Sequence, residues 1–355
     1  MRISEVTSER SSTKRALSMS SRWRSKVEGA LLRQKGPLAT RKFLPPTDKS
    51  HRTPWRHRWK APWALAIPGV IVGLLFYVWP LVVSLYLSLT QLNVFYLANW
   101  LHAPFIGISN YLALFNPATP FGHDFLASLQ AAGIFTVSAI IVGLPLGLLG
   151  ALAMQRKMRG RSVFRVLFIL PYAIPVFVSA LIWRLMLLQK TGLVDHIAGL
   201  LDSRASNTYW LIGPNAIWAI VMANVWASWP FFYLFALGAM QSISGELYEA
   251  AGLDGANGIA KFRRITLPLI ARPLLIATAL SFIYHFNNFT TPFVMFGTTP
   301  PNSANTLPLT IYLFGFTEEN FGAATAMSVL SMAVLMVPMI FYLRALKRTR
   351  EGTFR

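Results

Sequence analysis

Long apolar segments separated by shorter polar connections dominate the sequence from residue 63 to residue 343. Each segment reaches the ~20 residues that an α-helix needs to cross the hydrocarbon core of a bilayer. A helix is the expected form, because it satisfies its backbone hydrogen bonds within one segment. The pattern therefore predicts an all-α membrane protein with six transmembrane helices, at 63–89, 125–154, 163–188, 215–240, 273–296 and 322–343.

Proline recurs within these segments, where it removes a backbone donor and disturbs a helix. Membrane helices tolerate such breaks where a neighbouring helix or cavity water satisfies the freed carbonyl groups. Local breaks are thus compatible with six spans. The prolines are Pro68, Pro80, Pro145, Pro171, Pro175, Pro230, Pro292 and Pro338.

The basic residues are distributed unevenly among the connections. The chain carries 33 Lys and Arg against 13 Asp and Glu, and 54% of its residues are hydrophobic. Basic side chains gather in 155–162, in 241–272 and after residue 343, whereas 90–124 and 297–321 contain none. Because connections rich in Lys and Arg remain in the cytoplasm, we predict that both termini and the two basic connections are cytoplasmic. The long uncharged stretches argue against a nucleic-acid-binding surface.

Three regions follow from this pattern. Residues 1–62 hold 16 of the 33 basic residues and few apolar runs, so we expect a largely disordered cytoplasmic tail that contacts anionic lipid. Residues 63–343 form the transmembrane domain, with a core at about 125–343. Residues 344–355 form a second cytoplasmic tail.

Several kinds of chemistry lack their usual sequence signals. The chain contains no cysteine, and its six histidines show no metal-ligand spacing. No GxxxxGK[ST] loop for ATP phosphates is present either. We therefore expect no metal, no cofactor and no catalytic residue, and predict that this chain is not an enzyme.

The connection 241–272 has the pattern of a short helix followed by a turn. Residues 246–251 favour a helix, Gly255 permits a sharp bend, and Pro268 leads into the next span. We expect a compact helix-turn-helix outside the bilayer, a shape suited to docking on another protein.

The same connection resembles the EAA signature of ABC importer permeases: Glu-Ala-Ala, three residues, Gly, nine residues, Ile, one residue, Leu-Pro. The resemblance implies the type I permease fold, with a cytoplasmic coupling helix that inserts into a cleft of the ATPase subunit. Glu249 is then expected to pair with a basic group of that subunit. The residues implied in coupling are Glu249, Ala250, Ala251, Asp254, Gly255, Phe262, Leu267 and Pro268.

Further resemblance covers roughly residues 60–345. Residues 105–111 resemble the FxGxxNY stretch of sugar permeases, and 165–175, 224–230 and 286–289 resemble the larger membrane subunit of the maltose importer. Two additional N-terminal helices and a periplasmic insertion of that subunit have no counterpart here. The C-terminus does not resemble the tail of the smaller maltose subunit, which favours the larger-subunit role.

Polar side chains within the spans are candidates for sugar contact, because they are costly when they face lipid. By resemblance, Ser228 and His285 stand where the family has a glycine and an asparagine, and Val176 replaces a serine, which counts against maltose itself. Ser281, His285 and Asn288 are spaced i, i+4, i+7 and would share one helix face. Alternatively, such groups only form hydrogen bonds between helices, each of which stabilises the helix packing by about 0.6 kcal/mol. The implied substrate-binding residues are Tyr172, Asn224, Ser228, Ser281, His285 and Asn288.

The resemblance implies the permease subunit of an ABC importer that moves a sugar, a di- or oligosaccharide, across the bacterial plasma membrane. The implied partners are a second permease subunit, two copies of an ABC ATPase subunit, an extracytoplasmic sugar-binding protein and membrane lipid, with no nucleic acid. One alternative is an ABC permease for a non-sugar solute such as a polyamine, which would share the EAA loop. Another is a membrane enzyme or ion-coupled carrier, but these normally need intramembrane carboxylates or a metal site, and the predicted spans contain no acidic residue.

Overall fold

The computed structural model describes residues 60–155, 159–201 and 208–352. The predicted tail at 1–62 lies outside these residues, except that helix α2 (Lys60–Gly73) begins three residues before the predicted boundary. The chain divides into two compact units, residues 1–70 and 71–355. In the first unit, the described residues are the first turns of α2.

Helices account for nearly all of the secondary structure in the described residues. The predicted all-α class is therefore confirmed. The first span combines α2, the π-helical turn η3 (Leu74–Val78) and α3 (Trp79–Leu87). The helices that are long and apolar enough to cross a membrane are Ala66–Leu87, Pro120–Ala153, Gly213–Gln241, Gly258–Phe296 and Phe321–Lys347, and the bent pair Arg161–Ala173 and Val176–Met186 makes a sixth span if its halves are counted together.

The third predicted span, 163–188, is wrong as one continuous helix. It consists of α6 (Arg161–Ala173) and α7 (Val176–Met186), which meet at 90°. The break follows from Pro175, because proline forces the residue before it out of the helical region. Ile174 accordingly has an extended backbone, with φ −78° and ψ 131°.

The fifth predicted span, 273–296, is also interrupted. Helix α12 (Leu267–Phe286) ends six residues before Pro292, and α13 (Thr290–Phe296) follows after a short break. A continuous helix would place the ring of Pro292 against the carbonyl group of Asn288 and would leave that carbonyl without a donor. In α13, Pro292 lies in the first turn, where no such donor is needed.

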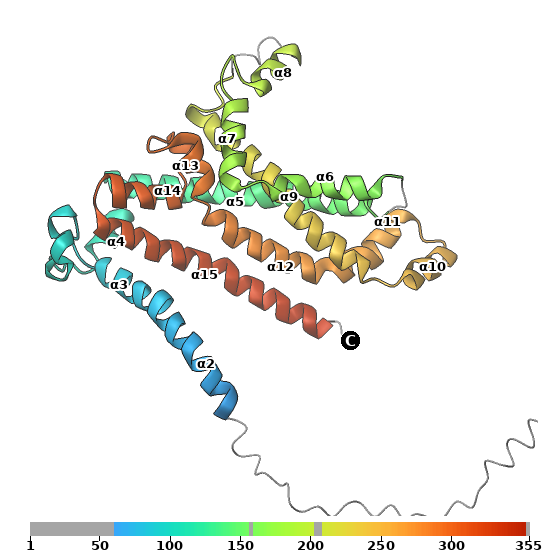
Figure 1. The fold of residues 1–355 in the computed structure, drawn as a ribbon, viewed down its shortest axis with the longest axis horizontal. Helices are drawn as coiled ribbons and strands as arrows, with labels where there is room; N and C mark the ends of the chain where they lie inside the picture. The colour runs from blue at the N-terminus through green and yellow to red at the C-terminus, as the bar shows by residue number, and fades with distance from the viewer. Residues whose placement is uncertain (1–59, 156–158, 202–207, 353–355) are drawn as a thin grey trace, which may run out of the picture. The chain divides into compact units, whose positions relative to one another are not determined.

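Helices α5 (Pro120–Ala153) and α9 (Ala216–Gln241) form the centre of the second unit and pack against each other along much of their length, and α12 packs against both (Figure 1). A glycine allows this close approach. A Cβ atom at Gly147 would lie 2.6 Å from the Cβ of Phe232 and from the backbone nitrogen of Tyr233. A larger side chain would push the two helices apart, as at other small-residue interfaces in membranes.

The last helix, α15 (Phe321–Gly352), packs against α3 and α12. It continues past the end of the predicted span at residue 343, so most of the predicted tail at 344–355 is helical. The residues that follow 343 are mainly Arg, Leu, Ala and Lys, which favour a helix even though they are too polar for the bilayer core.

The connections carry short helices that the apolar pattern does not predict. In 297–321, α14 (Leu307–Tyr312) and the π-helical turn η9 (Leu313–Thr317) form an apolar helix too short to cross a membrane. Its residues Leu307 and Leu309 are fully buried, since α14 packs against α5 and α15. The other short helices are η4 (Val94–His102), α4 (Ser109–Leu114), α8 (Leu193–Leu201), η6 (Gly213–Asn215) and η8 (Asn302–Ala304).

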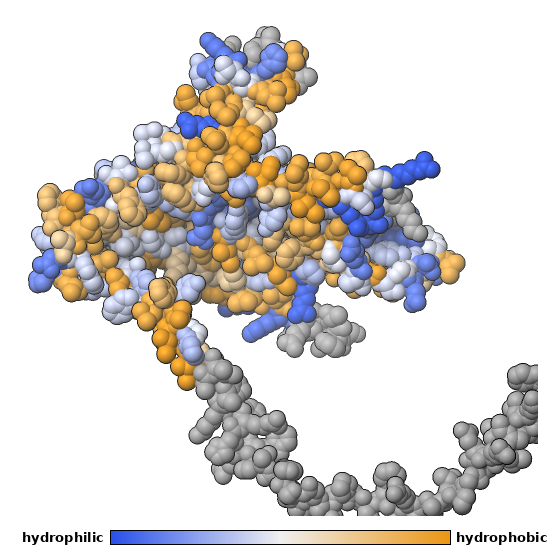
Figure 2. All heavy atoms as spheres, viewed as in Figure 1, coloured by the Kyte–Doolittle hydropathy of each residue, from blue (hydrophilic) through white to orange (hydrophobic). Residues whose placement is uncertain are grey.

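Apolar side chains cover much of the outer surface of the second unit (Figure 2). Leu149, Val166 and Phe177 are each more than half exposed. Exposed apolar area of this extent marks a surface that meets lipid or other subunits. Hydrophilic residues gather at the end that carries α10 (Gly245–Leu253) and α11 (Gly258–Lys261), and α4 and α14 lie at the opposite end (Figures 1 and 2).

Candidate functional site

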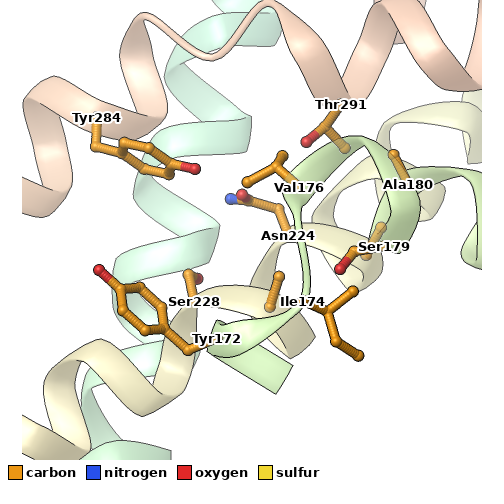
Figure 3. Close-up of a pocket in the computed structure, with 11 residues that line it drawn as sticks. Tyr172, Ile174, Val176, Ser179, Ala180, Asn224, Ser228, Tyr284 and Thr291 are labelled. Atoms are coloured by element: carbon orange, nitrogen blue, oxygen red, sulfur yellow. The ribbon is translucent and has the colours of Figure 1, made fainter. Parts of the chain in front are cut away.

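A cavity of about 570 Å³ lies where the α6–α7 break faces α9 and α12. Its walls combine the extended backbone of the break with side chains from the two central helices. A smaller cavity of about 50 Å³ shares part of this wall and reaches Ser179, Asn224 and Thr291 (Figure 3). The residues that line the larger cavity are Tyr172, Ala173, Ile174, Pro175, Val176, Ser228, Phe231, Leu280, Ser281, Tyr284 and His285.

Two tyrosines stand at one end of this cavity system. Tyr172 and Tyr284 are each 50% exposed, and Figure 3 shows both rings on the side away from Ser179 and Thr291. Tyr172 was expected from the sequence, whereas Tyr284 was missed. The available signal was its position three residues after Ser281, on the same side of α12.

Polar groups behind the tyrosines form a buried hydrogen-bonded chain. Asn224 Nδ2 lies 2.9 Å from His285 Nδ1, and Asn288 Nδ2 donates to Asn224 Oδ1 over a longer 3.4 Å. The backbone nitrogen of Thr291 donates to Asn288 Oδ1 at 3.0 Å. The four side chains are between 1% and 7% exposed. This chain connects α9 to the break between α12 and α13.

The structure corrects the expected position of Asn288. The spacing from Ser281 and His285 placed all three on one face of a continuous helix, but α12 ends at Phe286. Asn288 therefore lies in the break, outside the walls of both cavities and behind Asn224. Five of the six predicted residues line the cavities: Tyr172, Asn224, Ser228, Ser281 and His285.

Two hydroxyl groups in the wall of the smaller cavity lack partners. Ser179 Oγ and Ser228 Oγ are buried, and neither has a hydrogen-bond partner within residues 60–155, 159–201 and 208–352. A buried polar group without a partner costs about 1–3 kcal/mol. Such a cost is explained if the hydroxyl groups bind water or a polar ligand.

The cavity walls carry no formal charge. Of the described residues, those that line either cavity include no Asp, Glu, Lys or Arg. Nor do the described residues contain a group of three or more His, Asp or Glu placed to hold a metal ion. The site thus combines aromatic faces with neutral hydroxyl, amide and imidazole groups, the set that a neutral hydroxylated ligand requires.

The coupling loop, residues 241–272, contains the predicted helix and turn. Helix α10 begins after Ser244, whose hydroxyl accepts from the backbone nitrogen of Glu246 at 3.3 Å. The turn is made at Gly255, with φ +77°, a conformation that favours glycine. Helix α11 and the π-helical turn η7 (Phe262–Thr266) then lead to α12, where Pro268 lies in the first turn.

A hydrogen bond joins the two limbs of the coupling loop, and several of its apolar residues are exposed. Tyr248 Oη lies 2.9 Å from Thr266 Oγ1, which joins the two limbs. No residue of α10 is buried, and Leu253 is 91% exposed. The predicted coupling residues Glu249, Ala250, Asp254, Gly255, Leu267 and Pro268 are exposed, while Ala251 and Phe262 are half-buried.

The stretch 105–111 has a structural role that its sequence did not reveal. Asn110 Nδ2 donates to the carbonyl oxygens of Ser88 and Thr90, at 2.9 and 3.0 Å. Tyr111 Oη lies 2.6 Å from Ser88 Oγ. These bonds hold α4 against the end of α3. In the sequence, both helices are distant from the residues that line the cavities.

Comparison with known proteins identifies the family. Residues 143–351 match the model of the "binding-protein-dependent transport system inner membrane component", which covers more than half of the chain. The trehalose/maltose transport system permease protein MalF of Thermococcus litoralis is 30% identical over 293 residues, 82% of this chain and 95% of that protein. The sn-glycerol-3-phosphate transport system permease protein UgpA of Agrobacterium fabrum is 29% identical over 82% of this chain and 96% of its own length.

A solved structure shows the same fold. It is a bacterial ABC transporter involved in the import of the acidic polysaccharide alginate, with a TM-score of 0.70 and 22% identity, covering 83% of this chain and 97% of that chain. The region matched by the family model, residues 143–351, includes the residues that line the cavities and the coupling loop. This chain therefore belongs to the family of binding-protein-dependent transport system inner membrane components, the permease subunits of ABC importers.

Proposed function

We propose that this chain is one permease subunit of an ATP-driven importer for a sugar, a di- or oligosaccharide, in the bacterial plasma membrane. The observation that carries the proposal is the uncharged cavity with two tyrosine rings and buried hydroxyl, amide and imidazole groups. Sugars present apolar ring faces for aromatic contact and many hydroxyl groups for hydrogen bonds, so this wall chemistry fits them.

The alternative, a polyamine permease, fits the cavity less well. A polyamine carries several positive charges, which must be paired when they leave water. The described walls offer no carboxylate for that purpose. The relatives described above are named for the transport of trehalose or maltose and of sn-glycerol-3-phosphate, all of which carry hydroxyl groups.

The coupling loop supports the partners that this function requires. The exposed apolar residue Leu253 and the Glu249 carboxylate, which has no ion pair among the described residues, suit a cleft on an ATPase subunit. The complete importer would contain a second permease subunit, two ATPase copies and an extracytoplasmic binding protein. The alginate transporter has also been solved in complex with its periplasmic protein.

The proposed orientation places the coupling loop and both termini in the cytoplasm. The start of α6, which follows the basic connection 155–162, lies at the same end of the second unit as α10 and α11, and α4 and α14, from the connections without Lys or Arg, lie at the other (Figure 1). A reporter fused after residue 160 or 258 should be cytoplasmic, and one fused after 110 or 305 should be external. One inverted reporter among the four would contradict this orientation.

The function is tested by uptake into proteoliposomes. The importer would be purified from its native membrane by a tag on this chain and supplied with its binding protein and ATP. We expect ATP-dependent uptake of at least one of trehalose, maltose and maltotriose, and none of spermidine. Uptake of spermidine without any of the sugars would overturn the proposal in favour of the polyamine alternative.

A further inference from the structure

We propose that His285 is held as the neutral tautomer with its proton on Nε2, and that it donates a hydrogen bond from Nε2 to an acceptor oxygen of the substrate. Asn224 and Asn288 then act as positioning residues that fix this tautomer. The substrate part of the inference rests on the proposed function. The tautomer itself depends only on contacts within this chain.

The polarity of the buried chain is set at its far end by a backbone group. The N–H of Thr291 can only donate, and it lies 3.0 Å from Asn288 Oδ1. Asn288 must therefore direct its oxygen to Thr291, which leaves its Nδ2 group facing Asn224. A flipped Asn288 would place two donors against each other in a site that is only 7% exposed.

The same reasoning orients Asn224. Its Oδ1 accepts from Asn288 Nδ2 at 3.4 Å, so its own Nδ2 faces His285 Nδ1 at 2.9 Å. An amide nitrogen only donates, hence Nδ1 has to be the unprotonated, accepting nitrogen of the ring. A neutral imidazole with a bare Nδ1 carries its proton on Nε2. An imidazolium would oppose two donors at 2.9 Å.

The second ring nitrogen, Nε2, is the one available to a ligand. His285 is 1% exposed and packs edge-on against Phe135 and against Tyr284, with ring centroids 6.3 and 5.2 Å apart. Within the described part of the chain, Nδ1 is the ring nitrogen that is hydrogen-bonded. Because the ring also forms part of the cavity wall, the cavity is where Nε2 meets an acceptor.

This arrangement selects for a class of ligand. A neutral Nε2–H donor suits a hydroxyl, ring or glycosidic oxygen, whereas a protonated amine offers no acceptor. The nearby walls add Ser228, Ser281 and Tyr284, which can both donate and accept, and no charged group. We therefore infer that the cavity recognises neutral sugars by their oxygen atoms, with His285 as one of the hydrogen-bond donors.

A change at Asn288, which lines neither cavity, provides the sharpest test. In Asn288→Asp, the carboxylate can still accept from Thr291 but can no longer donate to Asn224. Asn224 must then turn its amide and present Oδ1 to His285, which requires a proton on Nδ1. The matched control is Asn287→Asp, which adds the same charge one residue away, where the Asn287 side chain is exposed and donates to the carbonyl of Ile283 at 2.9 Å.

The tautomer would be read by solid-state ¹⁵N NMR of the assembled importer labelled at its histidine rings, without sugar. The signals of His285 are assigned by their loss in His285→Gln. We expect an unprotonated Nδ1 and a protonated Nε2 in the unaltered protein and in Asn287→Asp, and a protonated Nδ1 in Asn288→Asp. Protonated Nδ1 in the unaltered protein would overturn the inference, even if Asn288→Asp does not assemble.

The donor role would be read as sugar moved per ATP hydrolysed, using whichever of trehalose, maltose and maltotriose is transported. Loss of one neutral hydrogen bond predicts a roughly fivefold fall in His285→Phe and Asn288→Asp. Asn287→Asp should keep the unaltered ratio, and His285→Gln should retain most of it, because its amide offers a donor in place of Nε2–H. An unchanged ratio in His285→Phe would overturn the donor role. If the unaltered importer moves no sugar, the proposed function fails while the NMR result still decides the tautomer.

Discussion

In the cavity, polar side chains are buried, whereas in the coupling loop, apolar side chains are exposed. Asn224 and His285 are 3% and 1% exposed, while Leu253 and Ile259 are 91% and 70% exposed. Each region thus reverses the arrangement that a surface in water would favour.

The comparison teaches that each region is completed by a different kind of partner. Buried polar groups regain their hydrogen bonds when a polar ligand enters, and two serine hydroxyl groups in the cavity still lack a partner. Exposed apolar groups gain free energy when a protein surface covers them. Damage to the cavity should therefore weaken substrate handling with the complex intact, and damage to the loop should break the complex.

Leu253→Asp should have the largest effect. The leucine makes little contact within the chain, so the permease should fold and insert, but the ATPase would lose an apolar contact worth about 1.5–3 kcal/mol. We expect at least a tenfold fall in the ATPase recovered with the tagged permease. The control is Leu200→Asp, at an α8 leucine that is 75% exposed. Full recovery with Leu253→Asp would disprove docking through this residue.

Gly255→Val should have the next largest effect. A Cβ atom at this position meets nothing within 4 Å, so the cost arises from its φ of +77°, about 1–2 kcal/mol for a residue other than glycine. A distorted turn should weaken ATPase binding by roughly fivefold to thirtyfold, measured by titration of purified ATPase. Gly258→Val is the control, since Gly258 also has open space but no positive φ. Equal weakening in both variants would mean that the left-handed turn is not the cause.

Ser228→Ala sharpens the cavity side of the comparison. Because Ser228 Oγ is buried without a partner in the described residues, its loss should not lower the unfolding midpoint of the importer. Removing one hydrogen bond to the sugar should lower cavity affinity roughly fivefold, with ATPase recovery unchanged.

The control for the cavity is Ser128→Ala. Ser128 is equally small and buried, but its hydroxyl donates to the carbonyl of Phe125 at 2.9 Å. It should lose some stability and leave uptake per ATP unchanged. If Ser228→Ala lowered stability without reducing uptake per ATP, and Ser128→Ala reduced uptake per ATP without lowering stability, Ser228 would have a packing role and no contact with the substrate.

Tyr111→Phe should have the smallest effect on transport. It removes the bond to Ser88 Oγ that fastens α4 to α3, at a cost of about 1 kcal/mol in the free energy of unfolding. We expect a lower unfolding midpoint with unchanged uptake per ATP, and no change for the control Tyr96→Phe. A fivefold loss of uptake with an unchanged unfolding midpoint would instead indicate that residues 105–111 contact the substrate.

The number and type of the spans could be predicted from the sequence, but their breaks could not. Six long apolar segments require membrane helices on physical grounds alone. Their prolines, however, behave differently: Pro145, Pro230 and Pro338 lie inside continuous helices, whereas Pro175 and Pro292 accompany breaks. Which proline ends a helix depends on whether neighbouring helices stabilise the disturbed turn, and a single sequence does not record those neighbours.

The candidate site shows the same limit. Asn224, His285 and Asn288 could be predicted from the resemblance to sugar permeases. Helical spacing, however, placed Asn288 on the same helix face as His285, although the helix ends at Phe286. The hydrogen-bonded chain joins Asn224 to His285 and to Asn288, which lie 61 and 64 positions further along the sequence, on either side of the end of α12. Such pairing follows from packing and has no periodic signal. The conformation of the coupling loop could be predicted more completely, because its helix and its glycine turn are local features of the sequence.

The most direct test of the division between cavity and loop is to measure sugar uptake and ATP hydrolysis together in one preparation of each variant. Ser228→Ala should assemble and hydrolyse ATP at the unaltered rate while moving roughly fivefold less sugar per ATP when the cavity is not saturated. Leu253→Asp should lose assembly, hydrolysis and uptake in the same proportion. If Ser228→Ala lost assembly, or Leu253→Asp lost uptake with its ATPase fully bound and active, the two regions would not have the separate roles assigned to them.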